Sequence, residues 1–193
     1  MTGIYQVKGL DAMDSRIVTL NLPIVADNNL SLIDLARRAV GRTNLYNICP
    51  SIPFERLVQN RGVGGIMYPM LIPCLPKWGE TAKKVAQRIA ASGFILGDIA
   101  ELAQLAAKYP DEIRKFAAVF ALDHGSRWKN ADGDICVSYV NIDGSRKRFS
   151  TYRLDRLFDE EDCVLVFRQV GHRFLALPPA VPCENNPCIK APA

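Results

Sequence analysis

Histidines, paired cysteines and long apolar runs are all scarce in this chain of 193 residues. Only His124 and His172 are present, and no two of the six cysteines stand in a C-x-x-C pair. Structural zinc sites usually need such a pair, so we expect no metal, and no motif indicates another cofactor. The longest uncharged run, 62–76, is too short to cross a bilayer and contains three prolines, so we expect no membrane insertion.

A large excess of one charge is also lacking. The chain has 24 Lys+Arg against 20 Asp+Glu, a net charge of +4, which allows a weak affinity for anions without requiring a nucleic-acid partner. Hydrophobic residues make up 49% and charged residues 23%, the balance of a soluble globular protein. The N-terminus has no basic segment followed by an apolar one, so we expect a cytoplasmic protein with reduced thiols.

The order of the sequence patterns predicts an α+β fold. We expect N-terminal strands and a helix, then a central helical hairpin region, then a C-terminal antiparallel β segment. These elements should form a single compact domain over 1–177, with a candidate sub-boundary near residue 125. The segment 178–193 is rich in proline and is expected to be a disordered tail.

Capping signals predict four helices. Ser31 and Gly41 bracket a helix over 32–40, Thr81 starts one that ends near 93, and Asp98 with Glu101 starts one that ends at Tyr109-Pro110. A further helix should begin at Asp111 and end at Gly125. Its inner stripe would comprise Ile113, Phe116, Ala117 and Phe120.

Alternation with a period of two predicts the strands. Segment 18–24 has this pattern, and Pro23 places it at a sheet edge or at a strand end. Residues 135–140 and 146–152 flank Asp143-Gly144, a strong signal for a β-hairpin. A buried strand should span 163–167, with 172–177 as its hairpin partner. We expect 43–79 to be an irregular apolar connection with a short helix over 54–59.

The two central helices before and after Pro110 are spaced like a helix-turn-helix. Ala103, Ala107 and Ile113 occupy suitable core positions, and the second helix would present Arg114 and Lys115 to a phosphate or a guanine edge. An ordinary pair of packed helices is the alternative, because the turn lacks a glycine.

A basic hairpin is the second candidate. Segment 125–156 carries seven basic and four acidic side chains, and Arg146, Arg148 and Tyr152 fall on one face of an alternating strand. Alternatively, its arginines pair with the acidic run 159–162. With the helical pair, the candidate nucleic-acid-binding residues are Arg114, Lys115, Arg127, Lys129, Arg146, Lys147, Arg148, Tyr152 and Arg153.

These patterns favour a small non-catalytic binding protein, regulatory or associated with nucleic acid. The first alternative is a protein-interaction or structural subunit that uses the apolar loop 62–76. Its partner-binding residues would be Ile66, Met67, Tyr68, Met70 and Leu71. The second alternative is a thiol-dependent enzyme in which Cys49 or Cys74 meets one of the two histidines in space.

Overall fold

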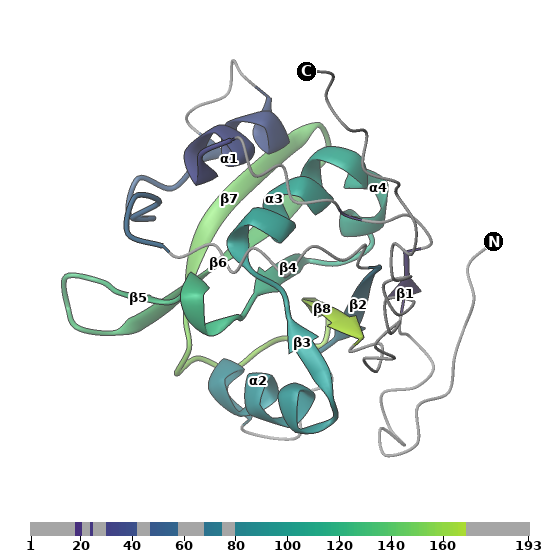
Figure 1. Ribbon diagram of the computed structural model, residues 1–193, viewed down its shortest axis with the longest axis vertical. Coiled ribbons are helices and arrows are strands. Elements are labelled where there is room, and N and C mark those ends of the chain that lie inside the picture. Colours follow the sequence, from purple (N-terminus) through teal and green to yellow (C-terminus); the bar gives the residue numbers. More distant parts are fainter. Residues whose placement is uncertain are drawn as a thin grey trace, which may run out of the picture.

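The chain folds around one mixed β-sheet with helices on both faces (Figure 1). The computed structural model describes residues 18–20, 24, 30–41, 47–57, 68–74 and 80–168. In these ranges the strands are β1 (Val18–Thr19), β2 (Pro69–Pro73), β3 (Phe94–Leu96), β4 (Ala118–Ala121), β5 (Trp128–Lys129), β6 (Ile135–Asp143), β7 (Arg146–Arg153) and β8 (Asp162–Arg168). The helices are α1 (Leu32–Val40), α2 (Ala82–Ala91), α3 (Ile99–Lys108) and α4 (Pro110–Ile113), with a 3₁₀ turn, η2, at His124–Ser126. The predicted strand 172–177 and the predicted tail lie outside the described residues.

Strand β8 lies in the middle of the sheet, although it is the last described element of the chain. The order along the sheet is β1-β2-β8-β4-β6-β5, with β3 also paired to β8 and β7 paired to β6. β8 is antiparallel to β2 and β3 but parallel to β4. The coarse expectation of helices mixed with strands is therefore confirmed. The C-terminal segment contains the expected antiparallel pair, β6 and β7, but the sheet as a whole is mixed because β8 runs parallel to β4.

The three longer helices form where the capping signals predict them. Ser31 and Thr81 accept the amides of Asp34 and Lys84 at the starts of α1 and α2. Asp98 and Glu101 form a reciprocal capping box at the start of α3. Local hydrogen bonds of this kind satisfy backbone donors that a helix cannot pair internally, so they are readable from a short stretch of sequence.

Each face of the sheet carries its own apolar cluster. One face packs under α1 and α3 and includes Leu165, Val140 and Phe149. The other packs under α2 and includes Val164, Val166 and Phe120. Because neighbouring strand residues point to opposite faces, the central strands are apolar at almost every position rather than at alternate ones.

The helix predicted to run from Asp111 to Gly125 is wrong. α4 ends at Ile113, and Ala118–Ala121 form β4, all four residues of which are buried. β4 lies between β8 and β6, so both of its faces need apolar side chains. A short continuous apolar run of this kind fits a buried helix or a central strand equally well by periodicity, and the sheet decides between them.

The connection predicted over 43–79 is not wholly irregular. Residues 69–73 form β2, which pairs with β8 through five residue pairs and is buried along its whole length. The helix predicted over 54–59 is a turn as far as residue 57, where the described stretch ends. β3 had no sequence prediction, because its three residues follow Gly93 directly and are too few to show a period.

The hairpin prediction is confirmed and lengthened. β6 and β7 pair from Cys136 with Arg153 to Asp143 with Arg146, and Gly144 occupies the turn with a φ of 54°. The left-handed conformation at this position favours glycine, which explains why Asp143-Gly144 was an informative signal.

The start of α3 is a buried polar junction. Asp98 is 2% exposed and Glu101 is 7% exposed, and the two exchange hydrogen bonds of 2.8 Å through their side chains and backbone amides. Ser126, in η2, accepts the amide of Ile99 at 2.8 Å. Burial raises the pKa of Glu101 to about 8, and repulsion from the carboxylates of Asp98 and Asp123 adds to this effect.

Gly97 lets this junction approach the centre of the sheet. Its amide donates to the Leu165 carbonyl at 2.8 Å, and its carbonyl accepts the amide of Asp123. A Cβ at this position would lie 2.5 Å from Cγ of Leu165. Only glycine therefore fits between β8 and the start of α3 without movement of the neighbouring side chain.

Candidate nucleic-acid interface

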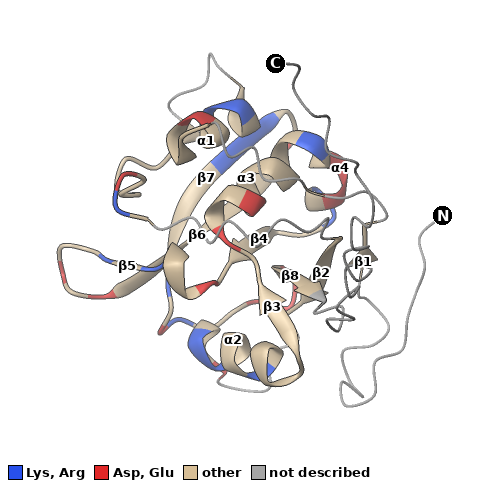
Figure 2. Ribbon diagram, in the orientation of Figure 1, with Lys and Arg blue, Asp and Glu red and all other residues tan. Residues whose placement is uncertain are grey.

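Five of the predicted basic residues gather at one end of the sheet, around the β6–β7 turn. Arg146 and Arg148 are exposed on β7, and Lys147 lies between them. The guanidinium of Arg114 donates to the carbonyl of Gly144 at 3.4 Å, which brings the end of α4 to the turn. We call this set, Arg114, Lys115, Arg146, Lys147 and Arg148, the basic tip (Figure 2).

The two outer arginines of the basic tip are exposed and differ from its other cations in that their guanidinium groups have no internal partner among the described residues. Residues two apart on a strand share a face, so Arg146 and Arg148 point to the side opposite Phe149, which is buried under the helices. Among the described residues, no carboxylate forms an ion pair with either arginine. Both guanidinium groups are therefore available to an external anion.

The remaining three cations of the basic tip have internal partners. Arg114 pairs with Asp111 through exposed side chains, and the exposed Lys115 pairs at 2.6 Å with Glu112, whose side chain is 29% exposed. Exposed pairs of this type contribute little and exchange readily with other anions. Lys147 instead donates to the Ala106 carbonyl at 3.1 Å, in the last turn of α3.

Lys147 also shows that like charges accumulate here. Its pKa is lowered, first by burial and then by repulsion from Arg114, while Asp111 opposes the shift. Two cations close enough to repel each other create a positive local potential, which an external anion would relieve.

The other predicted cations lie at the far end of β7. An eight-residue strand is about 23 Å long between its end residues, so Arg153 is remote from the turn. Arg153 binds Asp155 through two hydrogen bonds of 3.0 and 2.6 Å and pairs with Asp134 at 3.3 Å. These carboxylates, rather than the run 159–162, are its partners, and they raise its pKa against the opposing effect of desolvation.

Arg127 and Lys129 flank Trp128 on β5, near that same end. The Arg127 guanidinium donates twice to the Leu122 carbonyl, at 3.2 and 2.8 Å. Burial lowers the pKa of Arg127, although Asp123 opposes the shift. These hydrogen bonds from Arg127 stabilise the turn after β4. Lys129 is exposed on β5, an edge strand of the sheet. The nine predicted binding residues thus form two groups rather than one surface.

Tyr152 is partly buried and belongs to an aromatic cluster. Its ring stacks on Phe158 at 5.6 Å between centroids and meets Phe120 edge-on at 5.2 Å. Its hydroxyl donates to the Leu157 carbonyl. The expected role of Tyr152 in stacking a base would require this packing to open.

The helix-turn-helix expectation fails at its second helix. α4 has four residues and leads into β4, so no recognition helix presents Arg114 and Lys115. The two side chains instead flank the start of the buried strand. Arg114 reaches the basic tip through its hydrogen bond to the Gly144 carbonyl, a contact that neither helix spacing nor capping signals indicated.

The residues predicted to bind a partner are mostly inside the molecule or outside the described residues. Met70 is 6% exposed and Leu71 is fully buried, because both lie in β2. Tyr68, just before β2, is 49% exposed. Ile66 and Met67 fall outside the described residues. Of this set the structure therefore presents only Tyr68 on the described surface.

The two cysteines named as candidate nucleophiles have different environments. Cys74 is fully buried, and burial raises its pKa well above the ordinary value, which keeps its thiol protonated. Cys49 is half-buried, and its Sγ lies 3.0 Å from the hydroxyl oxygen of Ser51.

Among the described residues no group of three or more His, Cys, Asp or Glu side chains is arranged to hold a metal ion. In those same ranges no helix is long and apolar enough to cross a membrane.

One basic element near the tip was missed from the sequence. α1 packs against β7, and its last turn carries Arg37 and Arg38 (Figure 2). Arginines near a helix C-terminus are usually explained by their interaction with the helix dipole. Nothing in the sequence around Arg37 and Arg38 therefore predicted that they lie close to the β6–β7 hairpin.

No family model, no curated protein and no solved structure matches the chain.

Proposed function

We propose that this protein is a non-catalytic binding protein that contacts the phosphates of nucleic acid through the basic tip. The observation that carries the proposal is the bond from Arg114 to the Gly144 carbonyl. It joins the cations after α4 to those that begin β7, so one end of the sheet concentrates positive charge. Charge of this kind supplies sequence-independent affinity for a phosphate backbone.

The accessible cations favour phosphate contact over base reading. Arg146 and Arg148 stand at alternate positions on a strand, about 6.7 Å apart along it, which matches the spacing of adjacent phosphates on one strand of extended nucleic acid to within a few ångströms. Arg114 would join them by exchanging its exposed partner, Asp111, for a phosphate, and Lys115 by exchanging the partly buried Glu112. Base stacking does not enter the proposal, because Tyr152 is packed against Phe158.

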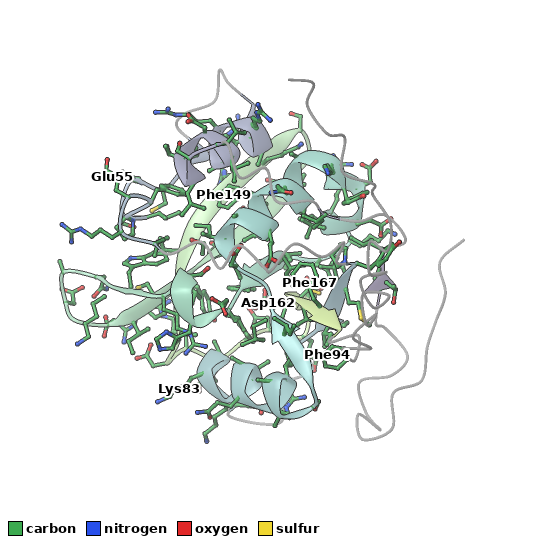
Figure 3. All side chains as sticks on the ribbon, in the orientation of Figure 1. Glu55, Lys83, Phe94, Phe149, Asp162 and Phe167 are labelled. Atoms are coloured by element: carbon green, nitrogen blue, oxygen red, sulfur yellow. The ribbon has the colours of Figure 1, made fainter. Side chains whose placement is uncertain are left out.

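The test is a salt titration of duplex and single-stranded DNA binding, followed by fluorescence anisotropy. The double variant Arg146→Gln/Arg148→Gln removes two exposed cations and should make the dependence of log K on log salt shallower by about 2 for duplex, or about 0.9 per phosphate contact. The matched control is Lys83→Gln/Lys84→Gln, which removes two exposed cations from α2 (Figure 3 labels Lys83). This control should retain the slope of the parent protein.

Three results would overturn the proposal. The first is no binding of either DNA at about 50 mM salt, where phosphate contacts are strongest. The second is an equal loss of slope in the α2 control, which would indicate diffuse attraction to net charge. The third is unchanged binding by the Arg146/Arg148 double variant.

A further inference from the structure

A cavity of about 710 Å³ is lined by residues of α1 and of the segment 47–57. Figure 1 shows these two parts of the chain next to each other. Its volume is within the range of sites that bind small molecules. Ile33 and Arg37 contribute from α1, and every residue from Ile48 to Arg56 contributes from the segment. The cavity is therefore formed by two parts of the chain that the sheet edge holds together.

The wall made by 47–57 is fixed by its own hydrogen bonds. The amide of Cys49 donates to the Phe149 carbonyl at 2.9 Å, which ties the segment to the outer edge of β7. The amides of Ile52 and Arg56 then close two turns on Cys49 and Pro53, at 3.2 and 2.8 Å. A wall held in this way is preorganised, so a ligand would lose little affinity to ordering it.

The lining combines an apolar body with two cations. Ile33, Ile48 and Phe54 are half-buried, and Pro50 and Pro53 extend the apolar surface between them. In the absence of a ligand, water covers this apolar surface, so contact with a hydrocarbon group would be favourable.

Arg37 and Arg56 supply the charge at this cavity. Arg37 pairs with Asp34 at 3.3 Å, but both side chains are nearly half exposed, so the pair is weak. Arg56 is exposed, and among the described residues no carboxylate forms an ion pair with it. Glu55 also lines the cavity, where its exposed side chain adds one negative charge beside the two cations (Figure 3).

We propose that this cavity binds a small amphipathic anion, an apolar chain that ends in a carboxylate, with the chain against Ile33 and Phe54 and the carboxylate between Arg37 and Arg56. A guanidinium recognises a carboxylate through two parallel hydrogen bonds, and the apolar wall favours a hydrocarbon body over a purely polar anion. The site shares no residue with the basic tip, although Arg37 lies near it, and the proposal does not depend on the proposed function.

The rate of Cys49 alkylation should measure how much of the cavity is occupied by ligand, because the half-buried Cys49 thiol lines the cavity. The other described cysteines, Cys74, Cys136 and Cys163, are buried. In the full chain with Cys183→Ser and Cys188→Ser, the rate of alkylation by iodoacetamide should therefore follow Cys49. Decanoate at ten times its Kd should slow that rate about tenfold, because about one site in eleven stays open.

Charge specificity is tested with variants and matched probes. Arg56→Gln should weaken decanoate binding, measured by calorimetry, about tenfold, as expected for the loss of one charge-assisted hydrogen bond. Arg156→Gln removes an exposed arginine elsewhere and should bind decanoate as the parent does. Decanamide, which has the same chain without the charge, should bind much more weakly.

The proposal is overturned if decanoate does not protect Cys49, or if decylamine protects it equally well. The second outcome would mean that the apolar wall attracts any amphiphile. Equal binding of decanoate by Arg56→Gln and the parent would also overturn it. Urea denaturation of Arg56→Gln separates these results from misfolding, because an exposed side chain should leave the stability unchanged.

Discussion

Replacement of Glu101 by glutamine should make the stability of the protein less dependent on pH between about pH 5 and pH 8. Glu101 is 7% exposed, and burial together with the nearby carboxylates raises its pKa from 4.5 to about 8. Glutamine keeps a side-chain oxygen that can accept the Asp98 amide, as Oε2 of Glu101 does at 2.8 Å. The substitution therefore removes a titrating proton and preserves the cap.

The sign of the effect follows from the raised pKa. Between pH 4.5 and about 8, folded Glu101 holds a proton that the unfolded chain has already released, so folding takes up a proton. The free energy of unfolding should then fall by about 1.4 kcal/mol per pH unit as the pH rises, and level off above the folded pKa. Stability is complete below the unfolded pKa and is lost through this window.

The assay is urea denaturation of the parent and Glu101→Gln at intervals from pH 5.5 to pH 8.5. Other titrating groups are common to both proteins, so the difference in unfolding free energy should grow in favour of Glu101→Gln by about 1.4 kcal/mol per unit. Glu160→Gln, an exposed change, should run parallel to the parent. Equal pH slopes for the parent and Glu101→Gln would refute the assignment of a proton to this buried pair.

Three further outcomes follow from the packing and the ion pairs. Gly97→Ala places a Cβ 2.5 Å from Cγ of Leu165 and should cost about 1–3 kcal/mol in urea denaturation; a loss within error would mean that Leu165 moves freely. Phe120 is 1% exposed and its ring contacts three other aromatic rings, so Phe120→Ala should lower the free energy of unfolding by about 3–5 kcal/mol in thermal and urea denaturation. A decrease of less than about 1 kcal/mol would contradict this packing. Arg153→Gln should leave duplex affinity unchanged in the anisotropy assay, since two carboxylates already hold this guanidinium; a loss comparable to that of Arg146→Gln/Arg148→Gln would show that the far end of β7 also binds.

Elements whose boundaries are set by local chemistry could be predicted from the sequence. Ser31 and Asp98 cap helices through hydrogen bonds to residues three positions on, and Gly144 adopts the positive φ that a tight hairpin turn needs. Each of these signals acts over a few residues, so no knowledge of the tertiary fold is required.

Elements defined by their neighbours could not be predicted. β4 is a strand because β6 and β8 cover both of its edges, and the run Phe116–Leu122 is equally apolar as a helix. β2 carries two prolines and resembles a loop until its pairing with β8 is known. In both cases the partner strand is remote in the sequence.

The candidate site shows the same division. The hairpin cations at 146–148 were found from alternation and the turn signal, and the structure places them together at the tip. The contribution of Arg114 was expected from a helix that does not form, and it reaches the tip through a contact with Gly144. Arg153 is separated from this group by the length of β7. The net charge of segment 125–156 carries no information about that distance.

The central place of β8 has a consequence for the order of folding during synthesis. A ribosome releases residues 162–168 after β2, β3 and β4, yet those three strands all need β8 as a neighbour. Until that segment emerges, the nascent chain carries three exposed strand edges with apolar faces, which are surfaces that chaperones hold and that otherwise aggregate. Completion of the sheet therefore requires translation of almost the whole described fold.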